Sequence, residues 1–201
     1  MIVESIEALR ALYPQPKDRV LRKQLSALDA HCLRFIALSP FVVIASTGEL
    51  GTMDASPRGG APGFVQAPDA HTLLLPDAPG NNRLDTLENV VATGRIGMLF
   101  MVPGVDETLR INGDARVSVA PSLLARFAAE PRAPRVVVAV TVREAYLHCA
   151  KSMMRSRLWS PQSLVPRESL PTMSRMMRDQ IGDEVPLETQ EQMLARYAAD
   201  L

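Results

Sequence analysis

The sequence predicts an α+β fold that is mainly β: a small, closed or nearly closed barrel of antiparallel strands with helices at both ends of the chain. Apolar and β-branched runs typical of strands recur along the chain, most clearly over 41–47, 96–102 and 135–143. Turn residues such as Pro103-Gly104 separate neighbouring runs by hairpin-length loops. Short hairpin connections favour antiparallel pairing, and a mostly antiparallel sheet of this size closes readily into a barrel.

The N-terminal residues 1–34 are expected to form helices that pack on the barrel or on a partner subunit. Ile2, Ile6 and Leu9 recur at helical intervals, and Pro14-Gln15-Pro16 ends this first helix. A second helical face of apolar residues runs from Val20 to Phe35.

The middle of the chain, residues 35–160, is expected to form the barrel domain. The predicted elements are strands over 41–47, 52–58, 64–66, 72–76, 96–102, 107–119 and 135–143, a helix from Leu84 and a short helix over 121–130.

The C-terminal residues 161–201 are expected to form a helical extension. A proline-rich linker over 161–171 leads into helices over 169–181 and 186–201. Methionines at one side of the first helix, Met173, Met176 and Met177, favour packing or dimerisation.

Composition excludes several classes of function. The 201 residues carry 22 basic and 22 acidic side chains, so no global positive field for nucleic acid is expected. Cys32 and Cys149 match no disulfide framework or zinc spacing, and three histidines argue against a multi-ligand metal site. Residues 1–4 do not begin a signal peptide and no run is long enough to span a membrane, so a cytoplasmic protein with reduced thiols is expected.

A polar turn precedes the predicted helix at Leu84. Asn81 and Asn82 offer amide donors, Arg83 offers a permanently charged fork, and the first N–H groups of a helix lack intrahelical partners. An anion site is one interpretation. The other is that Asn81 or Asn82 caps the helix and Arg83 lies in solvent.

A second polar motif, Ser56-Pro57-Arg58-Gly59, lies at the end of the strand over 52–58. Proline removes a ladder donor there, and glycine allows a ligand or another backbone to approach closely. The alternative is a bulge that turns a barrel corner and leaves Arg58 in water.

These two motifs belong to an ordered set of four. The other two are the hairpin Pro103-Gly104 with 108–115 (TLRINGDA) and the segment 148–159, which contains His148, Lys151, Arg155 and Trp159. Together they span about residues 35–160. In this order they resemble the pyridoxamine 5′-phosphate oxidase-like superfamily of FMN-binding split β-barrels, in its subgroup with SPRG, PGNxRxD and TLRxNGxA motifs.

The resemblance implies a cofactor site for FMN. Its phosphate is expected to contact Ser56, Arg58, Asn82 and Arg83, with the neighbouring Gly59, Pro76, Asp77 and Asn81 also at the site. Thr108, Lys151 or Arg155 would serve the pyrimidine side of the ring, His148 would border the ring, and Arg157 would lie close by. Without the resemblance, the segment 146–159 reads as a solvated amphipathic helix.

The function implied is that of an FMN-dependent oxidoreductase acting on an unidentified small molecule, with FMN held at a homodimer interface. The sequence assigns no catalytic residue and no metal ligand: it contains no Ser-His-Asp set, HExxH or CxxC, so redox chemistry would be the cofactor's. The alternatives are a non-catalytic FMN-binding or flavin-storage protein, or a relative that binds F420 or haem. Oxidation of pyridoxamine phosphate itself is not expected, because Arg155-Ser156-Arg157 stands where that enzyme's substrate signature has Arg-x-His.

Overall fold

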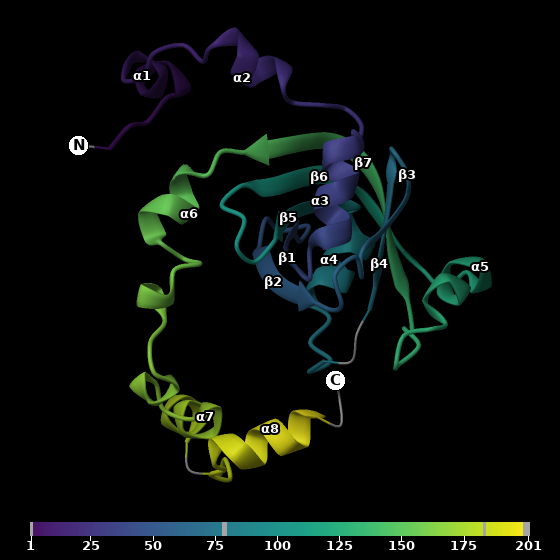
Figure 1. The fold of residues 1–201 in the computed structure, drawn as a ribbon, viewed down its shortest axis with the longest axis vertical. Helices are drawn as coiled ribbons and strands as arrows, with labels where there is room; N and C mark the ends of the chain where they lie inside the picture. The colour runs from purple at the N-terminus through teal and green to yellow at the C-terminus, as the bar shows by residue number, and fades with distance from the viewer. Residues whose placement is uncertain (1, 78–79, 183, 199–201) are drawn as a thin grey trace.

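The computed structural model describes residues 2–77, 80–182 and 184–198, and its centre is one antiparallel sheet of seven strands (Figure 1). The strand order is β2-β1-β5-β6-β7-β4-β3. The strands are β1 (Phe41–Thr47), β2 (Met53–Gly59), β3 (Gln66–Asp69), β4 (Thr72–Pro76), β5 (Arg95–Met101), β6 (Thr108–Ser118) and β7 (Val137–His148). Within the described ranges the edge strands β2 and β3 do not pair, so the barrel is open. The predicted mainly β, α+β architecture is confirmed.

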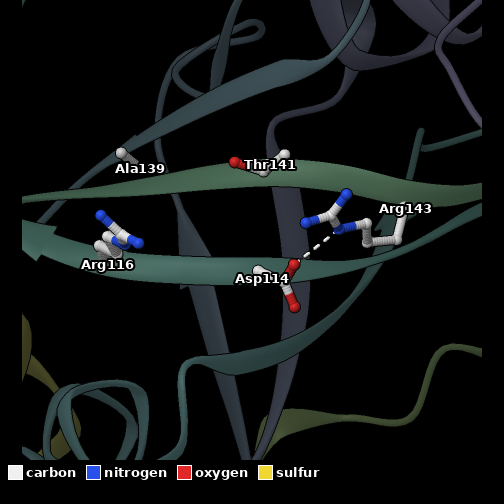
Figure 2. Close-up of a pocket in the computed structure, with 5 residues that line it drawn as sticks. All are labelled: Asp114, Arg116, Ala139, Thr141 and Arg143. Carbon is white, nitrogen blue, oxygen red and sulfur yellow. Dashed lines mark hydrogen bonds and ion pairs between the residues drawn. The ribbon is translucent and has the colours of Figure 1, made fainter.

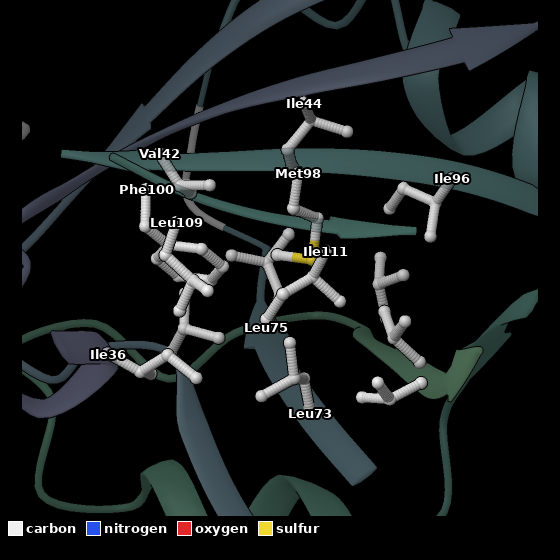
Figure 3. Close-up of a cluster of buried hydrophobic side chains, with 14 of the residues drawn as sticks. Ile36, Val42, Ile44, Leu73, Leu75, Ile96, Met98, Phe100, Leu109 and Ile111 are labelled. Atoms are coloured by element: carbon white, nitrogen blue, oxygen red, sulfur yellow. The ribbon is translucent and has the colours of Figure 1, made fainter. Parts of the chain in front are cut away.

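The hydrophobic core lies on the concave side of this sheet (Figure 3). Alternate residues of each strand face it, because successive side chains of a strand point to opposite faces. Val42 and Ile44 of β1 are fully buried, and Phe100 of β5 and Ile111 of β6 pack into the same cluster. Ile36 closes the cluster from a helix.

The helices differ in how they relate to the sheet. They are α1 (Ile6–Ala11), α2 (Asp18–Arg22), α3 (Ala30–Leu38), α4 (Asp85–Thr93), α5 (Pro121–Leu124), α6 (Lys151–Ser156), α7 (Met173–Ile181) and α8 (Gln190–Ala198). α3 and α4 pack on the sheet and bury Cys32, Ile36, Thr86 and Val90. α1 and α2 bury no residue and stand away from the sheet (Figure 1). None of the helices in the described part of the chain is long and apolar enough to cross a membrane.

The predicted helical face from Val20 to Phe35 is interrupted. Leu25 forms an isolated antiparallel bridge with Ala145 of β7, donating to its carbonyl at 2.9 Å and accepting from its N–H at 2.8 Å. β4 pairs with β7 as far as Thr141, and His71 accepts from the Val142 N–H, so the backbone groups of Ala145 need another partner. Leu25 satisfies them, and this gain outweighs the helical period of the local sequence.

β7 is longer than predicted and takes up the start of the segment expected to be helical. It continues to His148, where it pairs with Thr108 of β6, and α6 is only one short helix after it. The register shifts once, between Asn112 and Gly113 of β6. This bulge lets the two longest strands stay paired through the bend.

The part of the chain that follows α6, called the C-terminal arm below, contacts the barrel through Trp159. The Trp159 indole N–H donates to the Val105 carbonyl, in the β5–β6 hairpin, at 2.9 Å. Further along, the Ser174 hydroxyl donates to the Glu188 carbonyl at 3.1 Å, and the Arg178 guanidinium donates to the Val185 carbonyl. α7 is therefore bonded to the segment that precedes α8, and the arm arcs away from the sheet (Figure 1).

Candidate functional site

A hydrogen-bonded cluster joins β2 to α4 at the open side of the barrel. Asp54, Ser56 and Arg58 alternate along β2 and share its inner face, because they pair with the inward-facing Ser46, Ile44 and Val42 of β1. The Asp54 carboxylate accepts from the Thr86 hydroxyl at 2.5 Å and from the Ser56 hydroxyl at 2.8 Å. Arg58 donates to Thr86 Oγ1 at 3.2 Å. These four residues and Asp77, whose carboxylate also feels the charge of Arg58, are called the split cluster below.

The two acids of the split cluster respond differently to their surroundings. Burial raises the pKa of Asp54, but the hydroxyl bonds from Thr86 and Ser56 and the charge of Arg58 outweigh it, so the pKa is lowered. Burial also raises the pKa of Asp77, and there the charges of Arg58 and Arg135 only partly compensate. Arg58 therefore acts electrostatically on two acids, Asp54 within β2 and Asp77 directly after β4.

The loop before α4 is held in a conformation that leaves the helix N-terminus open. Asn82 and Leu84 have positive φ values of 58° and 60°, which are uncommon for residues other than glycine. Among the described residues no side chain caps α4, so the capping interpretation of Asn81 and Asn82 is wrong for this helix. Asn81 instead accepts from the Arg83 N–H at 3.1 Å. Pro79, the first residue of the PGNxRxD motif that runs to Asp85, lies outside the described residues.

Arg83 lies at the same place but is much more exposed than Arg58. It forms an ion pair with Asp85 at 2.8 Å, and 72% of its side chain is accessible. That bond is the main cause of its raised pKa, and the charge of Asp54 adds a smaller effect. An exposed ion pair of this kind is weak and can be exchanged for another anion at little cost.

Two further predicted residues sit beside the split cluster. Pro76 is the last residue of β4, directly before Asp77, and Gly59 is the last of β2. A Cβ at Gly59 would meet only the Pro40 carbonyl oxygen, at 3.6 Å, so packing does not require glycine there. The structure thus brings Ser56, Arg58, Gly59, Pro76, Asp77 and the 81–83 turn to one region.

A second group of predicted residues lies on the outer face of the sheet. Leu109 and Leu147 pack toward the core, so the alternating Thr108 and His148 belong to the other face, where they are direct partners on β6 and β7, although Thr108 is itself buried. Beside them, Lys23 Nζ lies 4.3 Å and Arg110 Cζ 5.2 Å from the centre of the Tyr146 ring. His148 meets the same ring edge-on, with centroids 4.9 Å apart. Arg110 also pairs with Glu144.

The remaining predicted residues, Lys151, Arg155 and Arg157, follow β7 and are exposed. Lys151 and Arg155 belong to α6, and Arg157 ends that helix with a positive φ of 51°. Within one chain the outer-face residues and the split cluster are thus on opposite faces of the sheet. The two groups of predicted residues are therefore not brought together in one continuous patch of the described chain.

A surface depression elsewhere on the sheet shares none of the predicted residues. It has a volume of about 350 Å³ and is lined by Asp114, Arg116, Ala139, Thr141 and Arg143 of β6 and β7 (Figure 2). Asp114 and Arg143 pair across the strands at 2.6 Å, while Arg116 lies apart from them. Because the depression contains none of the residues predicted for the cofactor site, we do not place the functional site there.

Sequence reasoning missed two members of the split cluster, Asp54 and Thr86. The signal for Asp54 was present, since it stands two and four residues before Ser56 and Arg58 on a predicted strand and must share their face. Thr86 had no such signal, because its contact with β2 joins residues 32 positions apart. In the described part of the chain no group of His, Cys, Asp and Glu side chains could hold a metal ion.

Comparisons with known proteins agree on the fold. A family model described as pyridoxamine 5′-phosphate oxidase matches residues 28–149. Among solved structures, HupZ from Group A Streptococcus is 14% identical with a TM-score of 0.51, covering 60% of this chain and 93% of that chain. A Clostridium acetobutylicum protein related to general stress protein 26 of B. subtilis (pyridoxinephosphate oxidase family) is 11% identical with a TM-score of 0.46, covering 60% and 90%. No curated protein matches.

Proposed function

Because the chain belongs to the pyridoxamine 5′-phosphate oxidase family, we propose that it binds FMN and acts as an FMN-dependent oxidoreductase on a small molecule. The observation that carries this proposal is the convergence of Arg58, Arg83 and the uncapped N-terminus of α4 at the open side of the barrel. Two guanidinium groups and free helix amides are the donors that a phosphate requires.

The phosphate end of FMN fits this region for three reasons. Arg58 is held by Thr86 and its charge acts at the gap between β2 and the end of β4. Among the described residues, the Arg83 guanidinium bonds only Asp85, a half-exposed side chain two residues away. Asn82 and Leu84, directly before α4, have a left-handed backbone, no described side chain caps the helix, and such strain is found at functional sites.

The positions of the residues predicted to contact the flavin ring favour a homodimer. Thr108, His148 and the basic residues of α6 would serve the ring, yet they lie across the sheet from the split cluster. In a two-fold dimer, the outer face of one protomer can meet the open side of the other, which yields two equivalent sites. When bound, FMN would supply the hydride chemistry, and the residues named here would hold and orient it.

The first test is the absorption spectrum of freshly purified protein, followed by identification of the released chromophore. A yellow protein that releases FMN supports the proposal. A deazaflavin or haem spectrum would replace FMN by the corresponding cofactor. Steady-state turnover with NADH or NADPH and added acceptors then separates an oxidoreductase from a non-catalytic FMN-binding protein, and a monomer with bound FMN in analytical ultracentrifugation would contradict the shared site.

The phosphate assignment predicts graded losses of FMN affinity. Arg58→Ala is expected to weaken binding about tenfold and Arg83→Ala about threefold, because Arg58 is positioned by Thr86 and Arg83 is exposed. Isothermal titration calorimetry measures both. Arg22→Ala is the matched control, since Arg22 forms an exposed ion pair with Asp18 on α2. Unchanged affinity in both site variants would contradict the assignment.

A further inference from the structure

Asp54 has the most hydrogen-bond partners in the split cluster, and the direction of each bond is fixed by chemistry. A guanidinium can only donate, so the Thr86 oxygen must accept from Arg58. Thr86 has a single hydroxyl proton, and it therefore goes to the Asp54 carboxylate, 2.5 Å away. Thr86 is only 3% exposed, so water does not compete for this arrangement. The order is Arg58 to Thr86 to Asp54.

The same carboxylate takes the proton of Ser56. The Ser56 hydroxyl lies 2.8 Å from one Asp54 oxygen and 3.1 Å from the other. While Asp54 is ionised, Ser56 has only lone pairs left for a ligand and cannot donate to a phosphate. The expected Ser56 hydroxyl donor is thus engaged in this structure.

Asp54 is also linked to β1 and α4 through Ser46 and Asn89. The Ser46 hydroxyl lies 3.5 Å from Asp54 Oδ2, and Ser46 accepts from the Asn89 amide of α4 at 2.9 Å. Ser46 is itself buried. Asp54 therefore links β1, β2 and α4 behind the guanidinium.

We infer that Asp54 is a positioning residue for the phosphate site: through Thr86 it holds Arg58 toward the ligand, and it removes Ser56 from the set of donors. This inference rests on the proposed FMN site and adds a residue outside the predicted set. It assigns the grip on the phosphate to Arg58, Arg83 and the α4 amides. Asp54 itself does not touch the ligand.

The test compares FMN with riboflavin, which lacks the phosphate, by isothermal titration calorimetry. Asp54→Asn is expected to weaken FMN about tenfold and to change riboflavin affinity less than twofold, because Thr86 and Ser56 donate to different carboxylate oxygens and the variant replaces one of these with an NH2 donor. Thr86→Val should reproduce this loss, and Thr86→Ser, which keeps the hydroxyl, should restore affinity to within twofold of wild type. Ser56→Ala is expected to change FMN affinity less than threefold.

Asp114→Asn is the matched control, because Asp114 also faces an arginine but lies on the outer face of β6. Equal losses for FMN and riboflavin would indicate general damage to the fold and would overturn the inference. So would a large loss in Ser56→Ala with none in Asp54→Asn.

Crystal structures distinguish failure of this inference from failure of the proposed FMN binding. If wild-type protein binds neither flavin, crystal structures of ligand-free wild type and Asp54→Asn still decide the point. Arg58 is expected on Thr86 in the wild type and released in the variant. An Arg58 that remains on Thr86 in the variant would overturn the positioning role.

Discussion

At the residue scale, His148 lies among charges that disfavour its protonated form. Partial burial lowers its pKa most, and the positive charges of Arg110 and Lys23 lower it further, while Glu144 opposes them. The histidine therefore stays neutral in the folded protein at pH values where an unfolded chain would protonate it. In the proposed site, this neutral imidazole is one of the outer-face residues that would border the flavin ring.

This predicts a contribution of His148 to acid sensitivity. An unfolded histidine titrates near a pKa of about 6.5, so as pH falls below that value the unfolded state gains a proton and the folded state does not. Stability is lost from there down to the lower pKa of the folded state. His148→Asn is expected to reduce the fall in unfolding free energy between pH 7.5 and pH 5, measured by urea denaturation. An identical fall in both proteins would show that His148 is not involved.

The candidate site could be predicted from sequence only in part. Ser56 and Arg58 follow from the alternation of a strand, and Asn81 to Arg83 from their place before a helix. Lys23 could not be foreseen: its contact with Tyr146 depends on the bridge between Leu25 and Ala145. Pairings of this kind join distant parts of the chain and leave no local period in the sequence.

At the element scale, the bulge between Asn112 and Gly113 determines how β6 and β7 stay paired along their whole length. A Cβ at Gly113 would lie 2.4 Å from the Thr141 carbonyl oxygen, closer than any real contact. The obstacle is backbone of the neighbouring strand, so it cannot rotate away. Glycine is required there by close approach of the strands.

Gly113→Ala is therefore expected to destabilise the protein by about 2–3 kcal/mol, the usual range for overpacking. Urea denaturation at pH 7.5 measures the change. Gly80→Ala serves as the comparison, because a Cβ there has no described atom within 4 Å and should change stability by less than about 0.5 kcal/mol. Equal stabilities for the two variants would contradict the close approach.

Strands were more predictable than their ends. The runs over 41–47 and 72–76 match β1 and β4 because their alternation and turn residues agree with their tertiary environment. β7 extends past the predicted end at Arg143 because β6 supplies partners as far as Thr108. Tertiary hydrogen bonds outweighed the local pattern at that end.

At the scale of the whole molecule, an open barrel carries two extensions that contribute little to its core. α1 and α2 bury no residue, and the core cluster contains no residue beyond 147. The C-terminal arm instead forms its own hydrogen bonds between α7 and the segment before α8. Free energy of unfolding in such a molecule is concentrated in the sheet.

Limited trypsin digestion is expected to cut the C-terminal arm before the sheet. Arg167 is exposed in a short connection, whereas Arg110 lies in β6, which is paired on both sides, and Arg143 lies within β7 and forms an ion pair with Asp114 of β6. Mass spectrometry should show early cleavage after Arg167 and a resistant fragment that retains residues 41–148. Early cleavage after Arg110 or Arg143 would contradict this order. Protection of Arg167 in the wild type would contradict it as well.

The bond between Trp159 and the Val105 carbonyl places the chain's single tryptophan at the joint between barrel and arm. The indole is thus an intrinsic optical probe of that joint alone. Its emission should shift to longer wavelength when the joint opens to water, while circular dichroism of the sheet remains constant. Separation of the two signals would let one sample report the movement of the arm and the integrity of the barrel independently.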